Sequence, residues 1–270
     1  MVHRPLGNHH VRPDTLLVTS DATKETVPVA EESEPHRELS DAVAGLVRGA
    51  RYVLFDFDGP ICRLFAGRPA TEIAQGQEEW LEAHGLGELL TEEDRSVQDP
   101  HAVLARLARQ QPGSDLVQEM EKRLTEQELA AVPTAWPTPW ADPLVRTWSA
   151  VGARLAITTN NSPEAVRRYL AGRELSVCFE PHIYGRTQDL NLLKPDPYCL
   201  NRALSAMGAA PGQALMIGDA SSDCAAAAAA GVAFLGYARN EEKEKRLRKA
   251  GAGHVVYDLE PILKLLRQHP

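Results

Sequence analysis

Two pairs of aspartates have a spacing that suits metal-dependent chemistry. Asp56 and Asp58 follow one short apolar run, and Asp219 and Asp223 follow another. Residues two apart on an extended backbone point to the same side. Two carboxylates on one side repel each other unless a cation joins them or one takes a proton. If Asp219 arrives from another strand end, three carboxyl groups surround one point, and such a site favours Mg²⁺.

Other polar residues point to a phosphorylated substrate, because magnesium neutralises phosphoryl oxygens. Lys194, in the sequence Leu-Leu-Lys-Pro-Asp-Pro, adds a point positive charge for the same oxygens. Thr159 can donate a hydroxyl hydrogen bond, and Asn160 follows it. Gly59 lets the backbone turn tightly after the first acids, and exposed N–H groups at such a turn bind anions. Arg63, just after this turn, is a candidate for binding a substrate anion.

Each of these residues also has an ordinary structural role. A single aspartate after a strand commonly forms a turn or caps a helix. The segment from Thr159 to Pro163 is a good helix start, with Ser162 as the cap. A lone lysine or arginine usually lies on the surface. The chemical interpretation therefore depends on all these sites occurring together, each at or near a strand end.

The elements that position these residues are predicted by hydrophobic pattern. Compact apolar runs that end in Asp, Thr or Gly predict buried strands at residues 52–57, 154–159, 214–219 and 232–236. Helical patterns follow at residues 163–170, 197–207 and 222–230, and a last strand and helix are predicted at 254–257 and 261–268. Alternating strands and helices predict an α/β fold with a Rossmann-like parallel sheet and helices on both faces. Ligands bind outside the carboxyl ends of such strands.

One region of the sequence has a different pattern. Residues 64–142 contain helical patterns and no strand-like run, which predicts a small all-helical cap domain. Residues 37–63 and 143–270 then form the α/β catalytic core, beginning with a short helix within residues 37–49. Residues 1–36 have little periodicity and are predicted to be a flexible N-terminal tail.

Composition narrows the class of protein. The net charge is -8, and the basic cluster at residues 243–249 follows two glutamates, so we interpret it as a solvated helix face and expect no nucleic-acid partner. No run of roughly 18 apolar residues exists, so we expect no membrane span. The four cysteines lack C-x-x-C spacing, and no secretory signal is evident, so we expect reduced thiols in a cytoplasmic protein. We expect the protein to be a monomer or a homodimer.

Together these motifs resemble the haloacid-dehalogenase-like hydrolase superfamily. Asp56-Phe-Asp-Gly-Pro60 is similar to its D-x-D-G-T/V signature, and Ile157–Asn160 to its second motif. Lys194-Pro195 is similar to the third motif, and Gly218–Asp223 to the fourth, G-D-x-x-x-D. The resemblance covers about residues 51–260, and the helical insert looks like the cap of phosphoglycolate-phosphatase-like members. Pro60 departs from the pattern and removes one backbone N–H.

The resemblance implies a Mg²⁺-dependent phosphatase that acts on a small phosphorylated metabolite. Asp56 would attack phosphorus and form an aspartyl-phosphate, while Asp58 would protonate the leaving oxygen and then activate water. The implied metal ligands are Asp56, the backbone carbonyl of Asp58, and Asp219, with Asp223 supporting them. Thr159, which precedes Asn160 as the motif expects, and Lys194 would bind the phosphoryl group.

Three other functions are weighed against this one. A phosphomutase of the β-phosphoglucomutase type would keep the chemistry and change the acceptor. A dehalogenase would lack the second aspartate of the first motif, so Asp58 argues against it. A catalytically idle binding module has no chemical need for the full set of Asp56, Asp58, Lys194, Asp219 and Asp223.

Overall fold

The structure is a computed structural model that describes residues 39–268. The tail predicted over residues 1–36 lies outside the described residues. The described chain begins with helix α1 (Asp41–Gly49), which falls within the helix predicted at residues 37–49. Its N-cap, Ser40, accepts a hydrogen bond from the backbone N–H of Val43 and so satisfies one free donor of the first turn.

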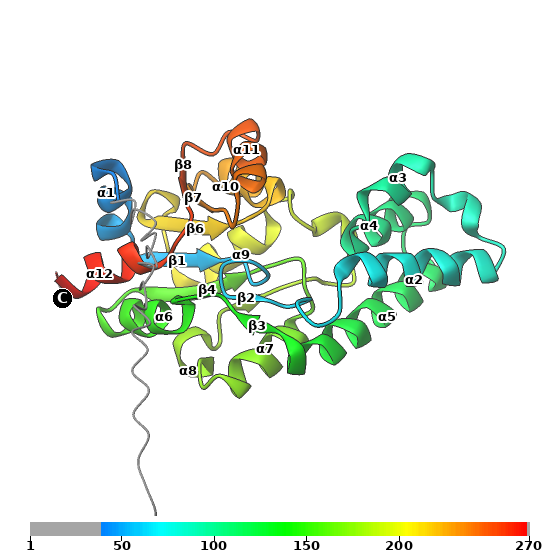
Figure 1. Ribbon diagram of the computed structural model, residues 1–270, viewed down its shortest axis with the longest axis horizontal. Coiled ribbons are helices and arrows are strands. Elements are labelled where there is room, and N and C mark those ends of the chain that lie inside the picture. The colour runs from blue at the N-terminus through cyan, green and yellow to red at the C-terminus, as the bar shows by residue number, and fades with distance from the viewer. Residues whose placement is uncertain (1–38, 269–270) are drawn as a thin grey trace, which may run out of the picture. The chain divides into compact units, whose positions relative to one another are not determined.

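Within the described residues, six parallel strands form one sheet in the order β5-β4-β1-β6-β7-β8 (Figure 1). In that order their bounds are Ile183–Tyr184, Arg154–Thr158, Tyr52–Phe55, Ala214–Gly218, Ala233–Tyr237 and His254–Val256. Strand β1 is central, and its Phe55 is paired with Ile157 on one side and Ile217 on the other. The strand order reverses at β1, where sheets of this kind bind their ligands.

Helices cover both faces of this sheet because alternate strand residues point to opposite sides. Val53 and Phe55 pack in one cluster with α1 and three further helices, α6 (Ala141–Ala150), α7 (Pro163–Gly172) and α12 (Glu260–Gln268). Leu54 packs in a second cluster, with α9 (Tyr198–Met207) and α10 (Ser221–Ala230). The predicted α/β fold with a Rossmann-like parallel sheet is confirmed.

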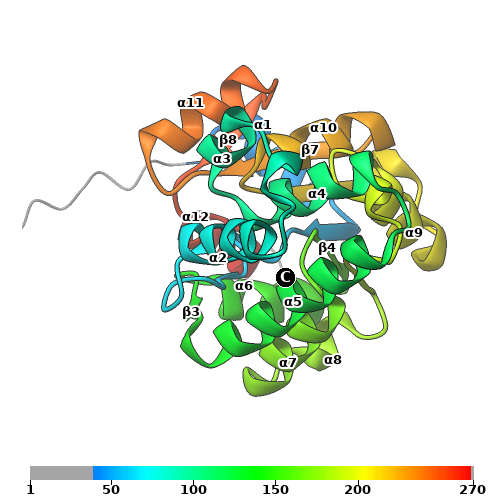
Figure 2. The ribbon, with the colours of Figure 1, turned by 90° about the vertical axis from the view of Figure 1, so that its right-hand side faces the viewer.

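Four helices lie between the first strand and the rest of the sheet in sequence: α2 (Ala70–Ala83), α3 (Glu92–Val97), α4 (Pro100–Gln110) and α5 (Asp115–Ala131). We call them the cap helices. Their own hydrophobic cluster includes Leu81, Leu104, Met120 and Leu124, all fully buried. Figures 1 and 2 show α2 and α5 side by side, with α4 packed against them.

A short ribbon adjoins both ends of this insert. Strands β2 (Cys62–Arg63) and β3 (Trp136–Pro137) pair antiparallel, and Thr138 Oγ1 donates a hydrogen bond to the carbonyl of Gly59. The sequence pattern predicted no strand within residues 64–142, because a two-residue strand is too short to show alternation.

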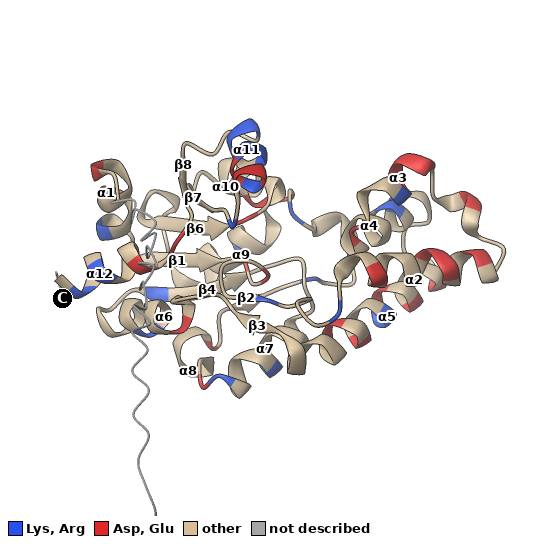
Figure 3. Cartoon of the chain, viewed as in Figure 1, with Lys and Arg blue, Asp and Glu red and all other residues tan. Residues whose placement is uncertain are grey.

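The remaining described elements are short connections and surface helices. They are α8 (Ser176–Phe179), α11 (Glu241–Lys249) and the 3₁₀ turns η1 (Gly87–Leu89), η2 (Val132–Thr134), η3 (Leu190–Leu192) and η4 (Pro211–Gln213). The basic residues of the predicted solvated face lie on α11 among acidic ones (Figure 3), and three of them form ion pairs one turn apart. No helix in the described part of the chain is long and apolar enough to span a membrane.

Candidate active site

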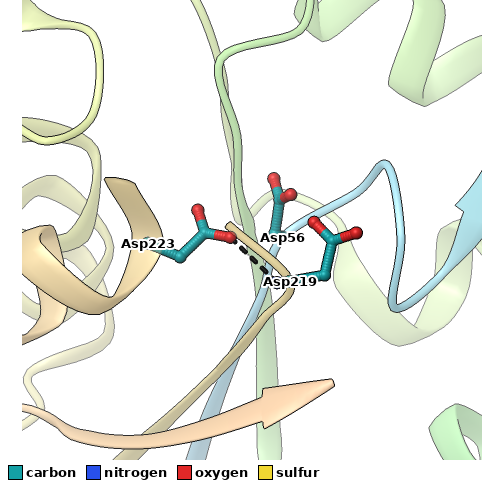
Figure 4. A group of neighbouring side chains, drawn as sticks. All are labelled: Asp56, Asp219 and Asp223. Atoms are coloured by element: carbon teal, nitrogen blue, oxygen red, sulfur yellow. Dashed lines mark hydrogen bonds between the residues drawn. The ribbon is translucent and has the colours of Figure 1, made fainter. Parts of the chain in front are cut away.

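Three aspartates meet at the carboxyl ends of the central strands (Figure 4). Asp56 follows β1, Asp219 follows β6, and Asp223 lies in the first turn of α10. One carboxylate oxygen from each lies within 4.8 Å of the others, and all three residues are buried. Buried like charges at this separation repel strongly, so the cluster requires cations.

Two glycines allow these aspartates to approach. A Cβ atom on Gly59, which has φ +122°, would lie 2.3 Å from Cγ of Asp219. A Cβ atom on Gly218 would lie 2.6 Å from Cβ of Asp223. Asp223 Oδ2 in turn accepts hydrogen bonds of 3.0 Å from the backbone N–H groups of Asp219 and Ala220. The turn after β6 is thus held by the same side chain that enters the cluster.

Lys194 provides a buried counter-ion for two of the carboxylates. Its Nζ lies 2.9 Å from Asp56 Oδ1 and 2.6 Å from Asp223 Oδ1, and it donates a third bond to the carbonyl of Thr158. Burial alone would lower the pKa of Lys194, but the charges of Asp223 and Asp56 raise it above its usual value. The ammonium is therefore charged at neutral pH. Burial, reinforced by the charge of Asp56, raises the pKa of Asp223 to about 6.

Lys243 of α11 also reaches the cluster, where its Nζ contacts Asp219 Oδ2. The sequence pattern predicts a solvated helix face for this residue, but its side chain is only 26% exposed. Burial lowers the pKa of Lys243, although the nearby charges of Asp58 and Asp56 oppose this shift. The sequence offers no signal for this contact, because the loop between β7 and the helix of Lys243 carries no recognisable motif.

Asp58 lies beside the cluster rather than in it. Strand β1 ends at Phe55, so the chain turns before Asp58, and one oxygen of its carboxylate accepts a hydrogen bond of 2.8 Å from the N–H of Leu64. Burial raises the pKa of Asp58 to about 6, and the charge of Asp56 adds to the increase. A carboxyl group with this pKa can both release and accept a proton near neutral pH.

The loop after β4 places the predicted threonine and asparagine next to Lys194. Thr159 Oγ1 donates to Asn161 Oδ1 and accepts from the N–H of Asn161, whereas the hydroxyl of Thr158 points to Met216 within the sheet. Both amide atoms of Asn160 bind the backbone of Lys194, at 2.8 and 3.1 Å. The side chain of Asn160 thus holds the backbone of Lys194, and its binding of phosphate stays a prediction.

Arg63, a predicted candidate for binding a substrate anion, lies against an aromatic ring. Its guanidinium lies 5.3 Å from the ring centroid of Trp136, across the β2–β3 ribbon. Within residues 39–268, no hydrogen bond or ion pair joins Arg63 to the aspartates or to Lys194.

The donor set fits a magnesium ion. Mg²⁺ is held in proteins by one or two carboxylates, with waters and substrate phosphate oxygens completing its shell. Asp56 and Asp219 offer such carboxylates, and the backbone at Gly59 lies against the carboxylate of Asp219. The ammonium groups of Lys194 and Lys243 leave one of the three negative charges unbalanced, and a divalent cation that took the place of Lys243 at Asp219 would balance all three together with Lys194.

A further part of the site is supplied by the cap helices and was not predicted. Glu128 of α5 and Arg186, which follows β5, form an ion pair of 2.9 Å in which both side chains are fully buried. Glu128 also accepts hydrogen bonds from Asn161 Nδ2 and from the N–H of Ser162. A glutamate inside a helical pattern usually faces solvent, so the sequence carries no signal for this role.

Comparison with known proteins now identifies the family. A family model described as haloacid dehalogenase-like hydrolase matches residues 50–231. The chain belongs to the haloacid dehalogenase-like hydrolase family. The family resemblance of the sequence motifs is confirmed, and so is the expectation of a hydrolase.

Individual relatives agree with this assignment. A phosphoglycolate phosphatase from Rhodospirillum rubrum is 37% identical over 105 residues, which cover 37% of this chain and 43% of the relative. A structure titled a predicted phosphatase from Clostridium acetobutylicum has a TM-score of 0.62 at 17% identity, covering 80% of this chain and 98% of that one. A predicted phosphoglycolate phosphatase from Haemophilus somnus has a TM-score of 0.57 at 18% identity, with coverage of 80% and 98%. At these identities the two structures show the fold alone.

Proposed function

We propose that this hydrolase is a magnesium-dependent phosphatase, which removes phosphate from a small phosphorylated metabolite through an aspartyl-phosphate on Asp56. One observation carries the proposal. The carboxylates of Asp56, Asp219 and Asp223 lie within 4.8 Å of one another, while Lys194 donates to Asp56. Negative charge next to a fixed lysine suits a site where a metal ion and a phosphoryl group meet.

In the first step, an oxygen of Asp56 attacks the phosphorus atom, and the bond from phosphorus to the ester oxygen breaks. Asp58, in its protonated form, gives its proton to that leaving oxygen, so the product departs as a neutral alcohol. The raised pKa of Asp58, about 6, keeps a fraction of this acid protonated near neutral pH.

In the second step, the ionised Asp58 takes a proton from a water molecule, whose oxygen attacks the phosphorus of the acyl phosphate. The bond between phosphorus and Asp56 breaks, inorganic phosphate leaves, and both aspartates return to their starting states. A covalent carboxylate thus divides one difficult displacement into two easier ones.

The remaining residues hold the phosphoryl group. Bound Mg²⁺, held by Asp56, Asp219 and the backbone carbonyl of Asp58 with Asp223 in support, would neutralise phosphoryl oxygens. Lys194 adds a fixed positive charge, and the hydroxyl of Thr159, which donates to Asn161 Oδ1 in the structure, would turn to donate to a phosphoryl oxygen. Asn160 keeps Lys194 in place through its two bonds to the lysine backbone.

The name of one relative, rather than any feature of the cap helices, suggests the class of substrate. The matched segment spans less than half of the Rhodospirillum rubrum protein, whose name makes phosphoglycolate the first compound to test. We propose a phosphate monoester of that size.

A phosphatase screen tests the proposal. Purified protein is incubated with several dozen phosphorylated metabolites and Mg²⁺, and inorganic phosphate is measured. We expect release from at least one, its loss in EDTA, and no release by Asp56→Asn, whose fold is checked by circular dichroism. Turnover by a well-folded Asp56→Asn variant would refute the mechanism. Phosphoryl transfer to a second sugar hydroxyl without free phosphate would indicate a phosphomutase, and silence across the panel a binding module.

A further inference from the structure

The ion pair of Glu128 and Arg186 is buried at the junction between a cap helix and the sheet. Both side chains are fully buried, and they join a cap helix to the loop after β5. Removing two charges from water is costly unless nearly every polar atom finds a partner. The hydrogen-bond partners of the two side chains therefore show which parts of the structure the pair holds together.

The carboxylate of Glu128 is saturated with donors. Its Oε1 accepts from Asn161 Nδ2 at 2.9 Å, from Arg186 Nη1 at 3.0 Å and from His101 Nε2 at 3.1 Å. Its Oε2 accepts from the N–H of Ser162 and from Arg186 Nη2, both at 2.9 Å. Burial alone would raise the pKa of Glu128, but Arg186 and His101 lower it to about 2. The group is a permanent anion at neutral pH.

Arg186 uses its guanidinium on both sides of the junction. On the cap side it donates to Glu121 and Thr125 of α5, at 2.9 and 2.8 Å, besides Glu128. On the other side its Nη1 donates to the carbonyl of Asn160 at 2.9 Å. Its backbone N–H donates to the carbonyl of Asn161. A lysine could not make these contacts, because the planar fork of arginine is what spans them.

Outside the cap helices, the contacts of the pair end on one loop, residues 159–162, which we call the phosphate loop. Its first residue is Thr159, and its Asn160 holds the backbone of Lys194 through two hydrogen bonds. Ser162 is the N-cap of α7, which runs beside α5 in Figures 1 and 2. The cap helix is thus bonded to the loop that carries Thr159 and that holds the backbone of Lys194.

We propose that Glu128 and Arg186 are positioning residues, which hold the phosphate loop and, through Asn160, Lys194 in the geometry that binds the phosphoryl group. The inference rests on the proposed function, since it concerns the same site. It makes α5 part of the phosphate-binding apparatus, besides any role of the cap in choosing the substrate. Neither residue touches the carboxylate cluster, so the pair should affect phosphate affinity far more than metal affinity.

The test compares Arg186→Lys with a matched control, Arg95→Lys. Arg95 lies in the cap helices and donates to Glu82 and to the carbonyl of Gly87, so it too bonds a carboxylate and a backbone oxygen. Dissociation constants for inorganic phosphate with saturating Mg²⁺, and for Mg²⁺ alone, are measured by calorimetry on the full chain, together with kcat and KM. Measurements are made well below the melting temperature, on protein shown to be folded by circular dichroism.

We expect Arg186→Lys to weaken phosphate binding and lower kcat, each at least tenfold, with a much smaller change in Mg²⁺ affinity. Arg95→Lys should alter none of these. Glu128→Gln should act in the same direction as Arg186→Lys, because it removes the charge and half of the acceptor capacity.

Three results would overturn the inference. The first is wild-type phosphate affinity and kcat in folded Arg186→Lys, which would make the pair merely structural. The second is recovery of phosphate binding in trimethylamine oxide, which restores folding but not a lost hydrogen bond. The third is equal loss of Mg²⁺ affinity. Failure of the wild-type protein to bind phosphate or release it from any ester would instead refute the proposed function.

Discussion

Replacing Lys194 by methionine removes a buried cation that two buried carboxylates share. Lys194 Nζ lies 2.9 Å from Asp56 and 2.6 Å from Asp223, and its side chain is 2% exposed. Removing one partner of a buried ion pair costs about 3–5 kcal/mol, because the other charge stays buried and unpaired. For a domain of this size each kcal/mol lowers the melting temperature by roughly 2–4 °C. We therefore expect a decrease of roughly 6–20 °C at pH 8 in EDTA.

The pH dependence of this loss follows from Asp223. Its pKa is raised to about 6, so in the folded protein Asp223 is largely neutral at pH 5 and ionised at pH 8. A neutral Asp223 needs no counter-ion. Removing Lys194 at pH 5 therefore leaves fewer buried charges without a partner than at pH 8. The difference in stability between wild type and Lys194→Met should thus grow as the pH rises through about 6. Added Mg²⁺ should raise the melting temperature of the variant more than that of wild type, since binding to the folded state alone stabilises it.

The assay is thermal unfolding by circular dichroism at pH 5 and pH 8, with EDTA or Mg²⁺. The control is Lys245→Met, since Lys245 is 79% exposed and its partner Glu241 is 3.7 Å away on the same helix. Such surface substitutions change stability by less than about 0.5 kcal/mol. The charge assignment in the cluster would be wrong if Lys194→Met had the same melting temperature as the control at pH 8 in EDTA. It would also be wrong if Lys194→Met lost the same amount of stability at both pH values.

Three further outcomes are expected. Asp58→Asn should lower kcat by about 10²–10⁴-fold, the usual contribution of a general acid and base; an unchanged kcat, measured as phosphate release, would remove Asp58 from that role. Lys243→Met should bind Mg²⁺ roughly five- to tenfold more tightly in calorimetry, because a competing contact at Asp219 worth about 1 kcal/mol is lost; weaker binding would contradict the competition. Gln77→Met should raise the free energy of unfolding by about 1–2 kcal/mol, since both polar atoms of this buried amide lack partners among the described residues. The exposed substitution Gln75→Met is the control. A decrease in the stability of Gln77→Met would show that the amide of Gln77 has a partner.

Much of the fold could be predicted from local pattern. Apolar runs ending in polar residues mark buried strands, and the helical patterns between them leave few arrangements other than a parallel sheet covered on both faces. The carboxyl ends of such strands lie along one edge, so residues far apart in sequence, such as Asp56 and Asp219, could be expected to meet. Strands β2, β3 and β5 were not predicted, because a strand of two residues shows no alternation.

Details of side-chain direction were harder to predict. Spacing suggested that Asp56 and Asp58 point the same way on a strand, but β1 ends at Phe55 and the chain turns between them. Asn160 could be assigned to the site by its place after β4. Its partner could not be assigned, because an amide binds a phosphate oxygen or a backbone group equally well.

The amino-acid sequence by itself determined which chemistry this protein can carry, since Asp56, Asp58, Lys194 and the acids after β6 stand where any parallel sheet would gather them. Only the tertiary structure decided what surrounds them. Glu128 and Arg186 are 58 residues apart, and each by itself is an ordinary charged side chain of a helix or loop. Their burial, like the contact of Lys243 with Asp219, results from how α5 and α11 pack, and that packing depends on all the elements together rather than on any local run of residues.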